Sequence, residues 1–145
     1  MRWYFDTSVL VAAAVRNHVH HVPAHEIVEE LIRSKHSGYL STHSLTEVYS
    51  VMTRTPFQPR IASGEALRLI DDQILRHMTL VSLDDTEYVD IVRRAASEGW
   101  IGGRIHDAIH LQCAAKMKCD RVYTFNVRDF RAVASERLAG RIAAP

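Results

Sequence analysis

The sequence predicts an α/β fold in which helices cover both faces of a mainly parallel sheet. Short β-prone runs alternate with helical segments along the chain, and no repeat, linker or low-complexity tract interrupts them. When a helix connects two consecutive strands, it forms a crossover, and strands joined by a crossover run parallel. With 145 residues the chain is expected to form one domain, residues 1–145.

The first part of the chain predicts two strands and three helices, from the β-prone composition of the former and the apolar spacing of the latter. In order these are strand 3–5, helix 7–16, helix 23–38, strand 39–41 and helix 44–54. Pro23 opens the second helix and Gly38 is expected to end it. Pro56 and Pro59 then break the chain.

The second part continues the alternation. In order we expect helix 63–77, strand 79–83, helix 84–99, helix 104–118, strand 121–125, and a last short helix and strand. Asp84 and Glu87 have the spacing of a capping pair at a helix start. In such sheets, binding sites form beyond the carboxyl ends of the strands. Asp6, Asn126 and Asp129 follow strands in this way.

Composition narrows the class of protein. Lys and Arg number 18 against 17 Asp and Glu, so the net charge of +1 excludes a protein that coats nucleic acid by charge alone. Cys113 and Cys119 form no metal-ligand pattern, and we expect one buried and one surface thiol in a reducing compartment. No run approaches the roughly 20 apolar residues of a membrane span. The opening apolar run is short and interrupted by Asp6, which argues against a targeting peptide, so we expect a cytoplasmic protein.

Four acids stand near predicted helix starts, and each has a structural explanation. Asp6 is placed to cap a helix, Ser44 and Glu47 have capping-box spacing, Asp107 lies in a first helical turn, and Asp129 is placed to cap the last helix.

The surroundings of two of these acids favour chemistry instead. Asp107 shares a face with Leu111 in a helix that is apolar on most sides, so its carboxylate is expected to point inward. An unpaired buried carboxylate costs several kcal/mol, and Glu47 raises the same question among apolar neighbours. Several acids that meet at strand ends would either raise one another's pKa or bind a divalent cation. Oxygen ligands suit Mg²⁺ or Mn²⁺.

Other chemistries lack their motifs. The chain has no G-x-G-x-x-G, no Walker A sequence and no G-x-S-x-G elbow. A phosphatase with an aspartate nucleophile would use FDTSVL, but Ser8 occupies the place where such enzymes carry a second Asp.

Four blocks of sequence follow one another in order along the chain: FDTSVLVA, LTEVYSVMTR, GGRIHDAIHLQCA and VYTFNVRDF. Together they resemble the PIN-domain ribonucleases, specifically the VapC-type toxins of toxin–antitoxin pairs. The resemblance covers the chain from Asp6 to Phe130 and implies a three-layer α/β/α sandwich. It also implies a metal-dependent RNA endonuclease that is held inactive by a small VapB-like antitoxin, and a homodimer. The open alternatives are a PIN-fold nuclease acting on DNA or structured RNA outside a toxin pair, and a noncatalytic interaction protein.

The resemblance also suggests the site residues. Asp6, Glu47 and Asp107 match the three regular acidic positions of the family. The fourth position is open: either Asn126 coordinates directly, or Asp129 supplies the charge, directly or through water, and we favour Asp129. One or two Mg²⁺ or Mn²⁺ ions would lie between Asp6, Asp107 and the fourth group, with Glu47 completing the cluster or orienting water.

Further polar residues lie close to these blocks. Ser8 and Thr124 match hydroxyl positions that hold water or support the acids in the family. Arg104 is the candidate for gripping RNA phosphates. His106 and His110 flank Asp107 and are expected to be partly exposed.

The other His residues gather in NHVHHVPAHE. His21 and His25 have helical spacing, but Pro23 between them argues against one continuous helix. We expect a solvated loop at the rim of the active site rather than a zinc site.

Overall fold

The computed structural model describes residues 1–145 and contains a five-stranded sheet with strand order β3-β2-β1-β4-β5. The strands are β1 (Arg2–Phe5), β2 (Ser37–Ser41), β3 (Met78–Val81), β4 (Arg121–Tyr123) and β5 (Ile142–Ala143). Every pair of neighbouring strands is parallel, so the predicted sheet type is confirmed.

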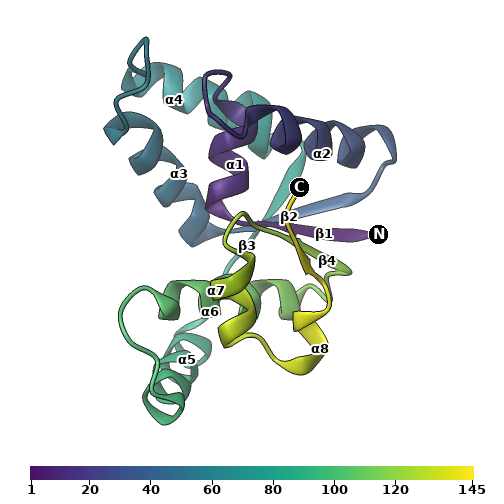
Figure 1. The fold of residues 1–145 in the computed structure, drawn as a ribbon, viewed down its shortest axis with the longest axis vertical. Coiled ribbons are helices and arrows are strands. Elements are labelled where there is room, and N and C mark those ends of the chain that lie inside the picture. The colour runs from purple at the N-terminus through teal and green to yellow at the C-terminus, as the bar shows by residue number, and fades with distance from the viewer.

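Two groups of helices cover the two faces of this sheet (Figure 1). One face carries α1 (Thr7–Ala14), α2 (His21–Arg33), α3 (Thr42–Arg54) and α4 (Ser63–Leu69). The other carries α5 (Asp85–Glu98), α6 (Arg104–Lys116), α7 (Val127–Val133) and α8 (Glu136–Ala139). The three-layer α/β/α sandwich expected from the sequence is therefore confirmed.

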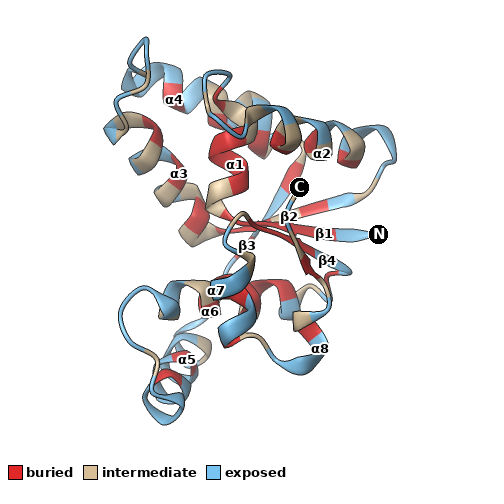
Figure 2. Ribbon diagram, viewed as in Figure 1, coloured by how far each residue is buried: buried red, intermediate tan, exposed pale blue.

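The sheet separates two hydrophobic cores, and successive residues of a strand enter opposite ones. On β1, Phe5 belongs to the core under α1 and α3, whereas Tyr4 belongs to the core under α6. Both side chains are fully buried, as Figure 2 shows for the central strands. A strand that is buried on both faces reads as a continuous apolar run, which explains the run at Trp3–Phe5.

The second helix differs from the prediction at both ends. It begins at His21, and Pro23 lies in its first turn, where a missing N–H breaks no intrahelical bond. It ends at Arg33, and Gly38 lies inside β2 rather than at the helix end. A Cβ on Gly38 would stand 2.7 Å from Leu31 Cδ2, so glycine lets the strand pack beneath α2.

Three smaller expectations have different outcomes. The helix predicted at 63–77 is α4 followed by a π-helical turn over Ile70–Leu75. Asp84 and Glu87 form the predicted capping box on α5. The expected surface thiol is wrong, because Cys113 and Cys119 are both buried and burial raises the pKa of each to about 12.

None of the helices has the length and apolar character needed to span a membrane.

Parallel strands place their carboxyl ends at one edge of the sheet. Asp6 follows the central strand β1, Thr42 follows β2 on one side, and Thr124 follows β4 on the other. Side chains from three distant parts of the chain therefore meet at this edge.

Candidate active site

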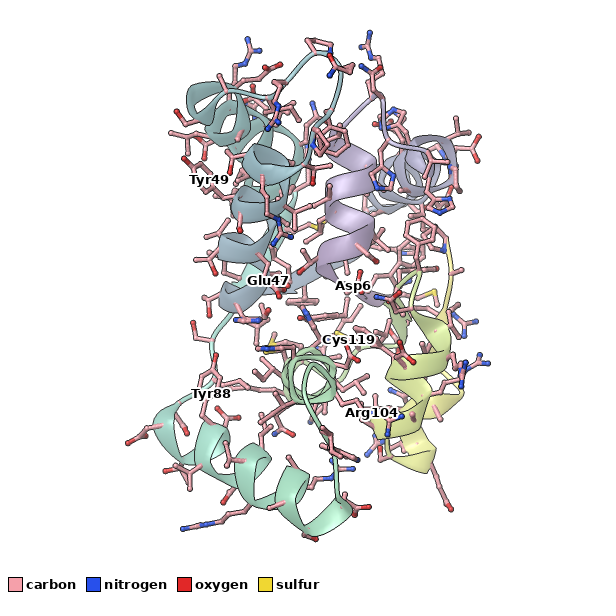
Figure 3. The ribbon with its side chains drawn as sticks, turned by 60° about the vertical axis from the view of Figure 1, so that its left-hand side comes forward. Asp6, Glu47, Tyr49, Tyr88, Arg104 and Cys119 are labelled. Carbon is pink, nitrogen blue, oxygen red and sulfur yellow. The ribbon has the colours of Figure 1, made fainter.

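An open cleft of about 490 Å³ lies at this edge of the sheet. Five of the residues predicted from the sequence line it: Asp6, Ser8, Glu47, Asp107 and Asn126. Figure 3 shows Asp6 at the start of α1 beside Glu47 on α3, with α6 seen end-on below them. The structure thus brings together acids separated by up to about a hundred residues of sequence.

Asp6 is buried and held by three hydrogen bonds. Its Oδ1 accepts from the Val9 backbone N–H at 3.1 Å and from Ser8 Oγ at 2.6 Å. Its Oδ2 accepts from Thr124 Oγ1 at 2.6 Å. The predicted N-cap of α1 is confirmed, and Oδ2, which accepts only one hydrogen bond, keeps a lone pair for a further ligand.

The two hydroxyls that hold Asp6 also hold the loop after β4. Ser8 Oγ accepts from the Phe125 N–H at 3.3 Å, and Thr124 Oγ1 accepts from the Asn126 N–H at 2.9 Å. Because each hydroxyl donates to Asp6 and accepts from this loop, the β4–α7 connection is fixed relative to the carboxylate.

Glu47 is surrounded by donors. Thr7 Oγ1 donates to its Oε2 at 2.6 Å, His43 Nε2 lies 3.3 Å from Oε1 without hydrogen-bond alignment, and His110 Nε2 lies 3.6 Å from Oε2. The His110 side chain is the main cause that lowers the pKa of Glu47 to about 2, with Thr7 and His43 adding to it and burial opposing it. Glu47 is therefore ionised across the neutral range.

The capping-box reading of Glu47 is wrong. The N-cap of α3 is Ser41, whose side chain accepts from the Ser44 N–H, so Glu47 lies one turn beyond the capping position. Its carboxylate is free to enter the cleft.

His110 is buried, with 4% of its surface exposed, so the expected partial exposure is wrong. Its Nδ1 lies 2.9 Å from the Tyr4 hydroxyl and 3.3 Å from Ser44 Oγ. Since a carboxylate only accepts, Nε2 carries the ring proton toward Glu47, and Tyr4 donates to Nδ1. The sequence contained a signal for this burial, because α6 is apolar on nearly all faces and His110 stands between Ile109 and Leu111.

Asp107 is half-buried in the first turn of α6, and its pKa is shifted in the opposite direction to that of Glu47. Burial raises its pKa to about 6, and the charges of Asp6 and Asp129 add to the rise, while His110 and His106 oppose it. No hydrogen bond is among the causes that shift this pKa. Asp107 is thus a carboxylate without a compensating donor.

The fourth position contains two different groups. Asn126 lines the cleft as the N-cap of α7, where its side chain makes no cap hydrogen bond. The expected capping role of Asp129 is wrong, because this exposed residue lies within the first turn of α7. Its charge nevertheless contributes to the raised pKa of Asp107, so Asp129 lies within electrostatic reach of the cleft.

The donor set suits a hard divalent cation. No three His, Cys, Asp or Glu side chains stand close enough together to hold an ion on their own. Mg²⁺ usually keeps several waters and takes only one or two carboxylates from the protein, which Asp6 and Asp107 can provide. The remaining lone pair of Asp6 Oδ2 and the uncompensated carboxylate of Asp107 fit such an ion.

The basic residue proposed for phosphate binding lies outside the cleft lining. Arg104 is exposed at the first position of α6, and the lining contains neither Lys nor Arg. His18 and His20 line the cleft, as expected for a rim loop. The loop expected at His21 and His25 is wrong, because both lie in the continuous helix α2, whose first turn accommodates Pro23.

A parallel five-stranded sheet between two layers of helices is the PIN-like fold of solved VapC structures. The PIN domain family matches residues 3–136. The chain belongs to the PIN-domain family, among the VapC-type ribonucleases. It is 32% identical to ribonuclease VapC27 of Mycobacterium tuberculosis over 79% of this chain and 78% of that protein. It is 34% identical to ribonuclease VapC40 of the same species over 92% and 91% of the two chains.

Solved structures confirm the fold. Mycobacterium tuberculosis VapC20, described as a toxin that cleaves the sarcin–ricin loop, superposes with a TM-score of 0.70 at 17% identity over 92% of this chain and 97% of that one. Rickettsia felis VapBC2, solved with a DNA fragment from its promoter, gives a TM-score of 0.64 at 15% identity over 88% and 90%. The predicted family and fold are therefore confirmed.

Proposed function

We propose that this protein is a Mg²⁺- or Mn²⁺-dependent endoribonuclease that acts as the toxin of a type II toxin–antitoxin pair. The reaction is hydrolysis of an RNA phosphodiester bond that leaves 5′-phosphate and 3′-hydroxyl ends. The observation that carries the proposal is the contrast between a buried, fixed Asp6 and an uncompensated Asp107 in one cleft of a VapC-type fold.

Asp6, Asp107 and either Asn126 or Asp129 would hold one or two ions. A bound divalent cation supplies an acidified water and neutralises charge on the phosphodiester. The raised pKa of Asp107 supports this assignment, because a cation would compensate the partly buried carboxylate and its repulsion by Asp6 and Asp129.

The remaining residues orient these groups. Ser8 and Thr124 fix the rotamer of Asp6 through both carboxylate oxygens. Glu47, kept ionised by His110 and Thr7, is placed to accept a hydrogen bond from water in the cleft and so to orient it, or to complete the cluster of acids.

The partners and location follow from the same family. The structural likeness to VapBC2 from Rickettsia felis supports a small VapB-like antitoxin as the partner of this chain. We propose that the protein meets its RNA in the cytoplasm and forms a homodimer there.

The test is cleavage of a total-RNA pool by the purified chain with Mg²⁺, Mn²⁺ or EDTA. Asp6→Asn and Asp107→Asn should each abolish metal-dependent cleavage, by a factor of about a thousand or more, while the far-UV circular dichroism stays unchanged. Glu98→Gln, an exposed acid at the end of α5, is the charge-matched control and should retain activity. Full activity in EDTA, or in either active-site variant, would refute the proposal.

A further inference from the structure

Four rings form a continuous row along one rim of the cleft, and we call them the ring wall: Phe57, His18, His20 and Phe125. Their successive centroids are 6.3, 5.8 and 4.6 Å apart, and the His20 and Phe125 rings stack with an interplanar angle of 24°. Three of these residues line the cleft directly. His20 is exposed and Phe125 half-exposed, so ring surface is open to solvent.

A second stack lies across the cleft. The centroids of the His43 and His106 rings are 5.1 Å apart and the two ring planes are nearly parallel, with an interplanar angle of 4°. We call them the histidine pair. His43 belongs to the helix after β2, whereas Phe125 follows β4, and these strands flank β1 on opposite sides. Asp6, at the end of β1, therefore lies between the ring wall and the histidine pair.

The charges of the cleft argue against binding RNA mainly through its backbone. The lining contains Asp6, Glu47 and Asp107 but neither Lys nor Arg. Phosphate-driven binding requires cations that displace counterions, and this cleft offers repulsion until a metal is bound.

The ring wall is suited to bases rather than to phosphates. Burial and the neighbouring His20 and His21 lower the pKa of His18, so its ring is uncharged at neutral pH. Neutral planar rings attract the π-faces of unstacked bases, and stacking tolerates any base identity.

From these observations we propose that the ring wall and the histidine pair are base-stacking platforms that hold single-stranded RNA on both sides of the acidic centre. The inference rests on the proposed function, since it takes RNA as the ligand of the same cleft. It adds that unpaired bases carry most of the binding, and that the strand crosses Asp6 with nucleotides stacked before and after the reacting phosphate.

The experiment measures binding separately from cleavage. A fluorescein-labelled, short, single-stranded oligoribonucleotide of mixed sequence is titrated with the full chain in Ca²⁺ and followed by anisotropy, with a gel to verify intact RNA. The same titration uses a duplex RNA and an oligomer with abasic positions. The variants are Phe125→Leu, which keeps apolar volume, and His20→Ala, which removes an exposed ring that makes no side-chain cap bond.

We expect each variant to weaken single-strand binding by about tenfold, within the range that stacking of one base provides. Tyr88→Leu, a partly exposed ring on α5 that lies far from Asp6 in Figure 3, is the matched control and should bind like the unmodified chain. The abasic oligomer and the duplex should bind the unmodified chain at least tenfold more weakly. The logarithm of affinity should fall with the logarithm of salt by a slope no steeper than about −1.4, as for two phosphates.

Three results would overturn the inference: unchanged affinity in both ring variants, equal affinity for the abasic oligomer, or no single-strand binding by the unmodified chain. These results are distinct from failure of the proposed function. Ring-dependent binding without metal-dependent cleavage would refute the nuclease and leave the platforms standing. Cleavage with the same KM in Phe125→Leu and the unmodified chain would refute the platforms and leave the nuclease standing.

Discussion

Glu47 and Asp107 face the same cleft but have opposite electrostatic environments. The pKa of Glu47 falls to about 2 because His110, Thr7 and His43 surround it. The pKa of Asp107 rises to about 6 because it is partly buried beside other acids. The negative charge of Glu47 is therefore compensated by side chains of the protein itself, whereas the negative charge of Asp107 requires a cation from solution.

This difference separates positioning from binding. Glu47 belongs to a buried network that runs through His110 to Tyr4 on the central strand, so its charge is compensated and its position is fixed. Asp107 has only repulsive carboxylate neighbours besides the two opposing histidines. A group that destabilises the metal-free fold and faces a cleft is a candidate ligand for a cation.

The comparison predicts stability changes of opposite sign in EDTA at pH 7. Glu47→Gln removes a charged acceptor from Thr7 and His110, and should lower the free energy of unfolding by about 1–2 kcal/mol. Asp107→Asn removes an uncompensated charge and should raise it by about 1 kcal/mol, allowing for solvent screening. Urea denaturation measures both, with Glu98→Gln as the control.

Changes of the same sign in the two variants would break the comparison. Mg²⁺ should raise the melting temperature of the unmodified chain but not that of Asp107→Asn. If Asp107→Asn is also the more stable protein in EDTA, the same carboxylate both destabilises the metal-free fold and binds the ion.

The pH dependence gives a second test. Asp107 has a folded-state pKa of about 6 against an ordinary 3.8, so its contribution destabilises the fold as pH rises through this window. Glu47 has a folded-state pKa of about 2 against 4.5, so its stabilisation is complete above pH 4.5 and is lost as pH falls toward 2. In EDTA, unfolding of the unmodified chain relative to Asp107→Asn should become easier between pH 4 and 6, by about 1 kcal/mol in total.

A flat difference between these two proteins across pH 4–6 would show that the Asp107 carboxylate is compensated after all. Relative to Glu47→Gln, the unmodified chain should lose its advantage only below pH 4.5.

The sequence predicted the sandwich because strand and helix periodicities alternate clearly, and it predicted the location of Asp6 because its strand is central and buried. The errors fall where tertiary packing overrides local signals. Gly38 reads as a helix stop, yet it lies in a strand because Leu31 and Met78 leave no room for a Cβ. Pro23 reads as a helix start, yet the helix begins at His21.

The site shows the same limit. Asp6, Glu47 and Asp107 were identified from their sequence blocks, but local sequence does not reveal which of them is compensated. His110 contacts Glu47 from 63 positions away in sequence, and Tyr4, on the central strand, holds the His110 ring through its Nδ1. Only the packing of α6 against β2 and α3 creates that network.

A smaller effect is expected at the inner end of this network. Tyr4→Phe removes the donor to His110 Nδ1, although Ser44 Oγ at 3.3 Å offers a partial replacement. The free energy of unfolding should fall by about 1 kcal/mol, and the pKa of Glu47 should rise. Tyr123→Phe is the control, a buried tyrosine for which burial alone is the main cause of a raised pKa. Chemical denaturation and carboxyl ¹³C NMR titration provide the two measurements, and equal effects of both substitutions would remove His110 from the comparison.

The smallest effect concerns the fourth position and separates Asn126 from Asp129. Asp129 is exposed and acts on Asp107 through its charge, which solvent screens strongly. Asp129→Asn should therefore lower the pKa of Asp107 toward its ordinary range and reduce Mg²⁺-dependent cleavage by only about threefold to tenfold, consistent with an energy of about 1 kcal/mol. Asn126→Ala, tested alongside it, removes an oxygen that lines the cleft. If Asp129→Asn abolishes cleavage as completely as Asp107→Asn, Asp129 binds the ion directly; if Asn126→Ala does so, the amide oxygen is the fourth ligand. Either result would extend the uncompensated wall of the cleft from α6 to the start of α7.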